Sequence, residues 1–349
     1  MRKTELTTLT MEELEEYCIN IGEKKFRAKQ IFEWIHRGAK SIDEMTNLSI
    51  NLRTKLKENA KITNMVIERK ITSKEDGTRK YLLLLEDDNV IEGVVMKYKH
   101  GLTACISSQI GCAMGCTFCA STVNGLVRNL TAGEMVKQIL LMQEDVGERI
   151  SNIVVMGIGE PLHNFKNLIS FLKIVNDENG LNIGNRHITI STCGLVPEIK
   201  KLADLKIPIN LAISLHAAND DIRKTLIPIA NKYSIEELLA SCRYYLEMTN
   251  RRITFEYALI DGVNDGEKDA RELRRLLKKM LCHVNLIPIN KIEERDYRKS
   301  DSKRIKKFKE ILEEFGVQVT IRREMGADID AACGQLRNKV LKSQNSNML

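Results

Sequence analysis

The chain has 349 residues, of which 43% are hydrophobic and 29% are charged, and these are the proportions of a soluble globular protein. No apolar run is long enough to span a membrane, and the length allows one large domain or a domain with an accessory piece. The net charge of +7 permits an anionic partner such as nucleic acid without requiring one.

The first segment is predicted to be helical. Thr10 and Glu13 form the sequence of a capping box, and Ala28, Ile31 and Phe32 fall on one face of a second helix. Strand-like runs follow at 64–72, 79–86 and 90–98, separated by polar turns. We therefore expect a helical accessory domain over 1–60 and a small sheet, as a β linker or extension, over 61–100.

From about residue 101, strands are predicted to alternate with helices. The strands are expected at 102–107, 152–156, 187–192, 208–215, 252–260 and 283–288, and the helices near 132–145, 165–176, 197–204, 234–248, 266–280 and 302–315. Such alternation predicts an α/β fold with a parallel sheet, and six repeats fit an open, partial (βα)6 barrel over 101–290. In such barrels the chemistry lies on loops at the C-terminal ends of the strands. Residues 291–349 are expected to add a helix, a last strand at 317–322 and a loop that carries Cys333.

Three cysteines spaced Cys112-x-x-x-Cys116-x-x-Cys119 are the most informative motif. Cysteine thiolates are the usual ligands of iron–sulfur clusters, and a four-iron cube held by three thiolates has one iron free to bind a small molecule. The alternatives are three unrelated core thiols or a structural zinc site, although structural zinc takes four ligands and no fourth Cys or His lies close by in the sequence. The spacing resembles the signature of the radical S-adenosylmethionine (SAM) enzymes, which implies a [4Fe–4S] cluster and SAM as cofactors.

Further motifs narrow this resemblance. The segments Cys105–Cys112, Met156–Pro161, Ser214–His216 and Asp330–Leu336 together resemble the RlmN family of adenine-C2 methyltransferases over nearly the whole chain. The resemblance implies methyl transfer to C2 of an adenosine in 23S ribosomal RNA, at the peptidyl-transferase centre, and in transfer RNA, 3′ of the anticodon. It also implies that two SAM molecules are consumed per turnover, one of which methylates Cys333 before the carbon passes to the base.

The same matching implies the roles of single residues. Cys333 corresponds to the methylated cysteine, Glu92 to the base that removes the C2 proton, and Cys105 to the thiol that forms a transient disulfide with Cys333 and frees the product. From the residues alone, Glu92 also fits an exposed strand carboxylate, and Cys105 also fits a thiol in a strand core. Phe118 is expected near the adenine ring of SAM. The positions that match SAM contacts are Gly159, Glu160, Ser191, Ser214, Leu215, His216 and Asn290.

The expected surroundings follow from composition and from the resemblance. Nine scattered cysteines and the lack of a signal peptide indicate a reducing cytoplasm. The accessory segment resembles the family's RNA-binding domain, and the basic helix Lys303–Lys309 is expected to add phosphate contacts. The resemblance implies flavodoxin as the electron donor. The protein is expected to be a monomer. The basic residues expected in the accessory domain's RNA contact are Lys24, Lys25, Arg27, Lys29 and Arg37.

Two other functions stay open at this point. One is the sibling activity that methylates adenine at C8, although those enzymes usually have alanine where this chain has Pro161. The other is a non-catalytic RNA-binding protein that contains a structural metal, for which zinc rather than iron is expected.

Overall fold

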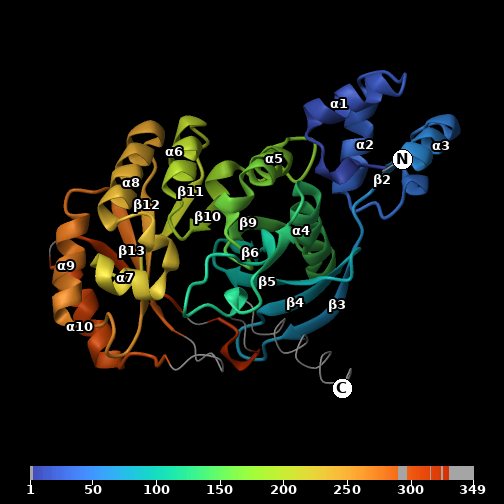
Figure 1. Cartoon of the computed structure of the whole chain (residues 1–349). Helices are drawn as coiled ribbons and strands as arrows, with labels where there is room; N and C mark the ends of the chain where they lie inside the picture. Colours follow the sequence, from blue (N-terminus) through green and yellow to red (C-terminus); the bar gives the residue numbers. More distant parts are fainter. Residues whose placement is uncertain (1–2, 290–296, 315, 324, 330–349) are drawn as a thin grey trace.

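The structure is a computed structural model that describes residues 3–289, 297–314, 316–323 and 325–329. A ten-stranded sheet runs through the molecule in the order β14-β13-β12-β11-β10-β9-β6-β5-β4-β3 (Figure 1). Its neighbouring parallel strands are β6 (Gly101–Cys105), β9 (Ile150–Val155), β10 (Ile188–Thr192), β11 (Asn210–Ser214), β12 (Ile253–Leu259), β13 (Cys282–Pro288) and β14 (Gln318–Ile321). Within the described residues the strand order does not close, so the predicted open, partial barrel is confirmed.

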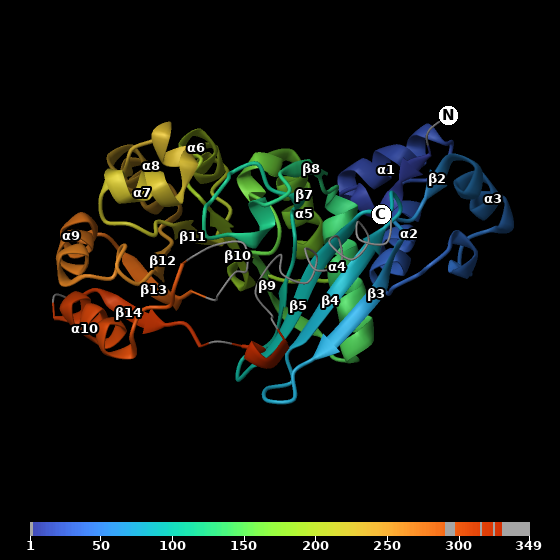
Figure 2. The ribbon, with the colours of Figure 1, turned by 60° about the horizontal axis from the view of Figure 1, so that its bottom comes forward.

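Helices cover the outer side of the parallel strands, as Figures 1 and 2 show. They are α4 (Ala132–Val146), α5 (Phe165–Asn176), α6 (Val196–Asp204), α8 (Ile235–Thr249), α9 (Glu267–Leu277) and α10 (Ser302–Glu313). Thr131 and Ser234 form capping boxes with Glu134 and Glu237, and these boxes satisfy the first backbone N–H groups of α4 and α8. The apolar faces of the helices and the strands share one continuous core.

The accessory segment contains three short helices, α1 (Met11–Asn20), α2 (Arg27–His36) and α3 (Ile50–Asn59). The capping box of Thr10 and Glu13 starts α1 as predicted. Leu14, Ile31 and Phe32 are almost fully buried between these helices. Strand β1 (Thr4–Glu5) pairs with β2 (Ala60–Lys61), which returns the chain to the main sheet next to α4.

Three antiparallel strands extend the barrel sheet. They are β3 (Met65–Thr72), β4 (Arg79–Leu85) and β5 (Val90–Tyr98), close to the ranges expected from their alternating pattern. The pattern suggested a small sheet of its own, but β5 pairs with β6 along five residue positions. The extension is therefore continuous with the parallel strands, because a hairpin at 99–100 folds β6 directly back on β5.

Three short elements were not predicted. Strands β7 (Gln109–Gly111) and β8 (Leu126–Asn129) pair with each other on either side of the cysteine motif, and α7 (Asp220–Leu226) follows β11. These elements are too short to show a clear period in the sequence. Among the described residues no helix combines the length and the apolar character needed to cross a membrane.

Candidate active site

A cavity of about 570 Å³ lies on the inner side of the partial barrel. Loops that follow the parallel strands line it, which is where such barrels hold their chemistry. The predicted site residues that it brings together are Cys105, Cys112, Cys116, Cys119, Gly159, Glu160, Ser191, Ser214 and His216. Asn290 and Cys333, which were also predicted, lie outside the described residues.

The cysteine motif occupies a loop closed by β7 and β8. The backbone N–H of Cys112 donates to the carbonyl of Gly125 at 2.9 Å, and Gly111 before it has a φ of 78°. A Cβ at Gly111 would lie 1.9 Å from the Gly125 carbonyl oxygen, so this turn requires glycine. The Thr122 hydroxyl donates to the carbonyls of Cys116 and Cys119 at 3.1 and 2.9 Å, and this contact holds the loop in a tight coil.

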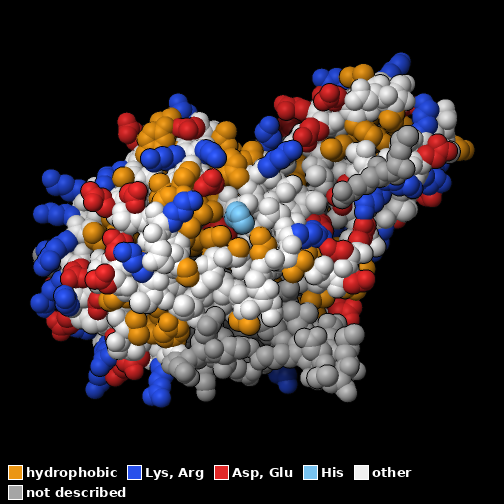
Figure 3. Space-filling model, in the orientation of Figure 1, with side chains coloured by type: hydrophobic (Ala, Val, Ile, Leu, Met, Phe, Trp, Pro, Cys, Tyr) orange, Lys and Arg blue, Asp and Glu red, His pale blue; other side chains and the backbone are white. Residues whose placement is uncertain are grey.

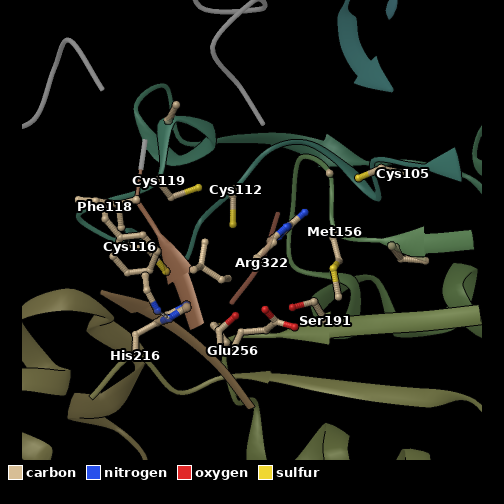
Figure 4. A pocket seen from close by; sticks show the side chains of 18 of the residues that line it. Cys105, Cys112, Cys116, Phe118, Cys119, Met156, Ser191, His216, Glu256 and Arg322 are labelled. Carbon is tan, nitrogen blue, oxygen red and sulfur yellow. Dashed lines mark hydrogen bonds between the residues drawn. The ribbon is translucent and has the colours of Figure 1, made fainter. Parts of the chain in front are cut away.

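The three thiols of the motif share one region of the cavity (Figure 4). Burial, with smaller contributions from repulsion by Cys119 and Glu160, raises the pKa of the Cys112 thiol to about 12, although a backbone hydrogen bond from Met114 opposes the rise. Burial also raises the pKa of Cys116, with Cys119 and Cys112 adding to the effect. Thiols in such a site ionise when a metal cation binds to them, because the cation stabilises the thiolates.

The arrangement fits a cluster. A cluster binds each thiolate at a different iron, so it needs thiols spread around a common space, and Cys112, Cys116 and Cys119 line one cavity. A cationic side chain also acts on this loop electrostatically. The buried Arg223 on α7 favours the thiolate form of Cys116, and its Nη1 has no hydrogen-bond partner within the described ranges.

Glu160 is held at the inner end of the cavity by several donors. It is 3% exposed, and its carboxylate accepts the backbone N–H groups of Cys193 at 2.8 Å and Leu162 at 3.0 Å. Burial raises the pKa of Glu160, whereas these hydrogen bonds oppose the rise. Gly159 precedes it with a φ of 112°, and a Cβ there would lie 2.6 Å from Gln109. The loop therefore fixes one carboxylate that is suited to an ammonium group.

The ends of β10 and β11 add polar groups beside Glu160. His216 has a φ of 55°, and its Nδ1 accepts the backbone N–H of Ala258 at 2.8 Å. Burial, together with Arg223, lowers the pKa of His216 to about 3, so the ring is neutral at physiological pH. The Phe118 ring meets His216 edge-on at 4.8 Å. Ser191 and Ser214 line the cavity, whereas Leu215 is buried in the main core and is not one of the lining residues.

Cys105 and Glu92 lie on the same face of the sheet. Cys105 stands opposite Val94 in the β5–β6 register, and Glu92 is two residues before Val94. Cys105 packs with Met96 and Met156 and lines the cavity, so it is both a strand-core thiol and a cavity thiol. Glu92 is only 3% exposed, which excludes the exposed carboxylate that the sequence also allowed, and it forms an ion pair with Lys80 at 3.2 Å.

Four charged residues that line the cavity were missed from the sequence, namely Glu256, Lys299, Arg322 and Arg323. Glu256 on β12 is 6% exposed and accepts a hydrogen bond from Asn285 at 2.9 Å, and burial raises its pKa. Arg322 follows β14 and extends toward the middle of the cavity (Figure 4). The signal for Glu256 was a single carboxylate inside the otherwise apolar run Ile253–Leu259, because a charge there must face a polar cavity or a partner.

The sequence of this chain is similar to those of known proteins. The family model of the ribosomal RNA large subunit methyltransferase N-terminal domain matches residues 4–62, and that of the radical SAM superfamily matches residues 106–274. A protein of Alkaliphilus oremlandii named "Probable dual-specificity RNA methyltransferase RlmN" is 68% identical over 98% of this chain and 100% of its own length. A protein of Clostridioides difficile with the same name is 56% identical over 97% of this chain and 98% of its own.

A solved structure agrees with these relatives. The crystal structure of a radical SAM methyltransferase from Sphaerobacter thermophilus superposes with a TM-score of 0.90 at 45% identity, and covers 95% of this chain and 98% of that one. Enzymes of the radical SAM superfamily use a [4Fe–4S] cluster and SAM, and the three thiols around this cavity fit that cluster. By its sequence, its fold and its cysteine-lined cavity, this chain belongs to the RlmN family of radical SAM methyltransferases.

Proposed function

We propose that the protein methylates C2 of adenosine in 23S ribosomal RNA, at the peptidyl-transferase centre, and in transfer RNA, 3′ of the anticodon. The methyl group passes through an S-methylcysteine at Cys333, and a transient disulfide with Cys105 ends the cycle. The observation that carries the proposal is the position of Cys105. Its thiol lines the same cavity as Cys112, Cys116 and Cys119, although it is not one of the motif cysteines.

The residues of the cavity divide the work of binding. Cys112, Cys116 and Cys119 hold the cluster, and Glu160 holds the ammonium group of SAM, with Gly159, Ser191, Ser214, the backbone of Leu215, and His216 completing its site. When bound, the cluster and SAM supply a one-electron reduction and a transferable carbon. Because Nδ1 of His216 accepts the Ala258 N–H, the neutral ring donates from Nε2 and adds no positive charge beside the sulfonium of SAM. Asn290 is proposed as a further SAM contact from the family match alone.

The release step uses two side chains of the sheet. Glu92 accepts the proton from C2 of the adenine. The Cys105 thiolate then bonds to the Cys333 sulfur, the bond between that sulfur and the transferred carbon breaks with its electron pair on the carbon, and the carbon takes up a proton to become the methyl group. Support for this pairing of roles comes from the register, because Glu92 and Cys105 occupy neighbouring positions on one face of adjacent strands. A base and a thiol that act on the same covalent adduct must lie this close.

Binding of RNA is assigned to basic surfaces. Figure 3 shows many Lys and Arg side chains at the end of the molecule where Figure 1 places α9 and α10. Arg322, Arg323 and Lys299 line the cavity itself and suit the phosphates next to a target adenosine. The accessory helices are proposed as a second RNA contact, with Lys24 and Lys25 between α1 and α2 and Arg27 at the start of α2. Affinity for a transfer RNA fragment is expected to fall steeply with salt.

One experiment tests the proposal as a whole. The cluster-loaded enzyme is incubated anaerobically with SAM and a reductant, and Cys333 is analysed by peptide mass spectrometry before and after RNA is added. We expect a methyl group on Cys333 that is lost as 2-methyladenosine appears in digested RNA. If 8-methyladenosine appears instead, or if methylation proceeds normally in Cys333→Ala, the proposed reaction is wrong.

A further inference from the structure

A lysine is completely buried beside Glu92. Lys80, on β4, is 0% exposed, and its Nζ lies 3.2 Å from Oε2 of Glu92, which is 3% exposed. Lys80 has buried neighbours in the sheet: the apolar Val94 stands opposite it on β5, and the aromatic Tyr81 follows it on β4. An ion pair of this kind is expensive to desolvate, and apolar residues of the same volume often stabilise a fold as well or better. Stability alone therefore gives no reason for a charged pair in this position.

The register places the pair next to the proposed release chemistry. Lys80, Val94 and Cys105 stand side by side across β4, β5 and β6, with their side chains on one face. Glu92 is two residues before Val94, so it is the diagonal neighbour of Lys80 on one side and of Cys105 on the other. Diagonal neighbours across a sheet are within reach of long side chains. Glu92 thus stands between a cation and the thiol that ends the reaction.

The backbone at Glu92 is held as well. The Ser107 hydroxyl donates to the Glu92 carbonyl at 2.7 Å and accepts the backbone N–H of Ile158 at 3.0 Å. Ser107 follows Cys105 by two residues, and Ile158 lies in the loop that carries Gly159 and Glu160. The hydroxyl therefore ties the strand of Glu92 to the segment of Cys105 and to the loop proposed to bind SAM. Lys80 is then the group that fixes the carboxylate end of the same side chain.

We propose that Lys80 is a positioning residue that orients the Glu92 carboxylate, through their ion pair, as the base of the release step, an inference that rests on the function proposed above. A general base must hold an acceptor oxygen within hydrogen-bond reach of the proton that it removes, and a partner fixed beside Oε2 holds the carboxylate in one orientation. During the step the C2 proton moves to the Glu92 carboxylate, while Lys80 remains an ammonium and exchanges neither a proton nor electrons.

The test separates the two halves of the reaction. Cluster-loaded Lys80→Met and Glu92→Gln enzymes are compared with the wild type for SAM cleavage, for methylation of Cys333, and for covalent RNA–protein adduct on denaturing gels. We expect Lys80→Met to keep the first two and to accumulate adduct, with release slowed roughly tenfold to a hundredfold at neutral pH, within the range that a general base contributes. When Lys80→Met is added to Glu92→Gln, release should slow no further, because Lys80 acts only through the Glu92 carboxylate.

A matched control is Lys137→Met on α4. Lys137 is also buried, at 6% exposure, and is not among the residues that line the cavity, so adduct release should be unchanged in this variant. Release at the wild-type rate in Lys80→Met, or further slowing when Lys80→Met is added to Glu92→Gln, would overturn the proposal. If the wild type itself shows neither Cys333 methylation nor adduct, the proposed function fails instead, which is a different result.

Whether the variants fold provides a second test of the proposal. If Lys80→Met does not fold, the double variant Lys80→Met/Glu92→Gln should fold again, because it removes the unpaired carboxylate along with its partner. Recovery in the double variant supports an ionised pair at this position. Failure of the double variant would show that Lys80 supports the fold independently of the Glu92 charge, and this outcome counts against the proposal.

Discussion

Replacing Arg223 by Met removes the group that joins two loops of the active site. Arg223 is 0% exposed, and it donates from Nη2 to the carbonyl of Cys193 at 2.7 Å and from Nε to that of Leu215 at 3.2 Å. A third contact, to the carbonyl of Ser214, is long at 3.4 Å. These carbonyls end β10 and β11, so the guanidinium satisfies backbone groups that the sheet leaves unpaired.

The expected loss follows from these contacts. A hydrogen bond to a charged group contributes about 1.5–3 kcal/mol, so the two shorter bonds give about 3–6 kcal/mol. Burial lowers the pKa of Arg223, which means that desolvation of the charged guanidinium opposes folding. Removing the guanidinium removes this desolvation cost as well, which offsets part of the stability lost with the hydrogen bonds. We therefore expect Arg223→Met to lower the free energy of unfolding by about 3 kcal/mol.

Urea denaturation of the cluster-loaded protein under anaerobic conditions measures this change. Arg271→Met on α9 makes the same substitution at a residue that is 58% exposed and paired with Glu267, for which a loss below about 0.5 kcal/mol is expected. SAM binding should weaken only in Arg223→Met, because only that variant releases the loops of Cys193 and Ser214. A stability loss in Arg223→Met that is within about 1 kcal/mol of the control refutes the reasoning.

Three further predictions concern single features of the structure. Gly111→Ala should prevent cluster assembly, measured as iron content, because its Cβ would lie 1.9 Å from the Gly125 carbonyl oxygen. The control is Gly125→Ala, because Gly125 has a similar φ of 64° but open space around it. This variant should lose only about 1 kcal/mol of stability and keep the iron. Burial lowers the pKa of His36 to about 4, so the unfolded chain binds this proton more readily. The contribution of the buried neutral His36 to the free energy of unfolding is complete above about pH 6.5 and falls by about 2 kcal/mol between pH 6.5 and 5. In urea denaturation, a His36→Gln variant should lack this part of the pH dependence. Cys119→Ala should lose iron and SAM cleavage together, while Cys105→Ala should keep both and stop at the RNA adduct; an iron-free Cys105→Ala protein would contradict the separation of these two thiols.

The sequence determined the fold class and the metal-binding loop. Alternating strand and helix patterns predicted the parallel sheet, because a half-buried helix and a buried strand have different periods. The spacing of Cys112, Cys116 and Cys119 predicted the cluster, because ligands of one cluster lie within a short loop and their distances along the chain are therefore fixed. Capping boxes at Thr10, Thr131 and Ser234 set the starts of three helices for the same local reason.

Only the tertiary structure decided which distant residues share the cavity. Glu256, Lys299, Arg322 and Arg323 were missed, because an isolated charged residue in or near a strand carries no local pattern. The strands at 65–98 form an extension of the barrel sheet rather than a sheet of their own, because strand pairing depends on long-range hydrogen bonds that leave no periodic trace. The same pairing brings Lys80, Glu92 and Cys105 together from three strands. Their separation along the chain says nothing of this contact, and the register of β4, β5 and β6 alone produces it.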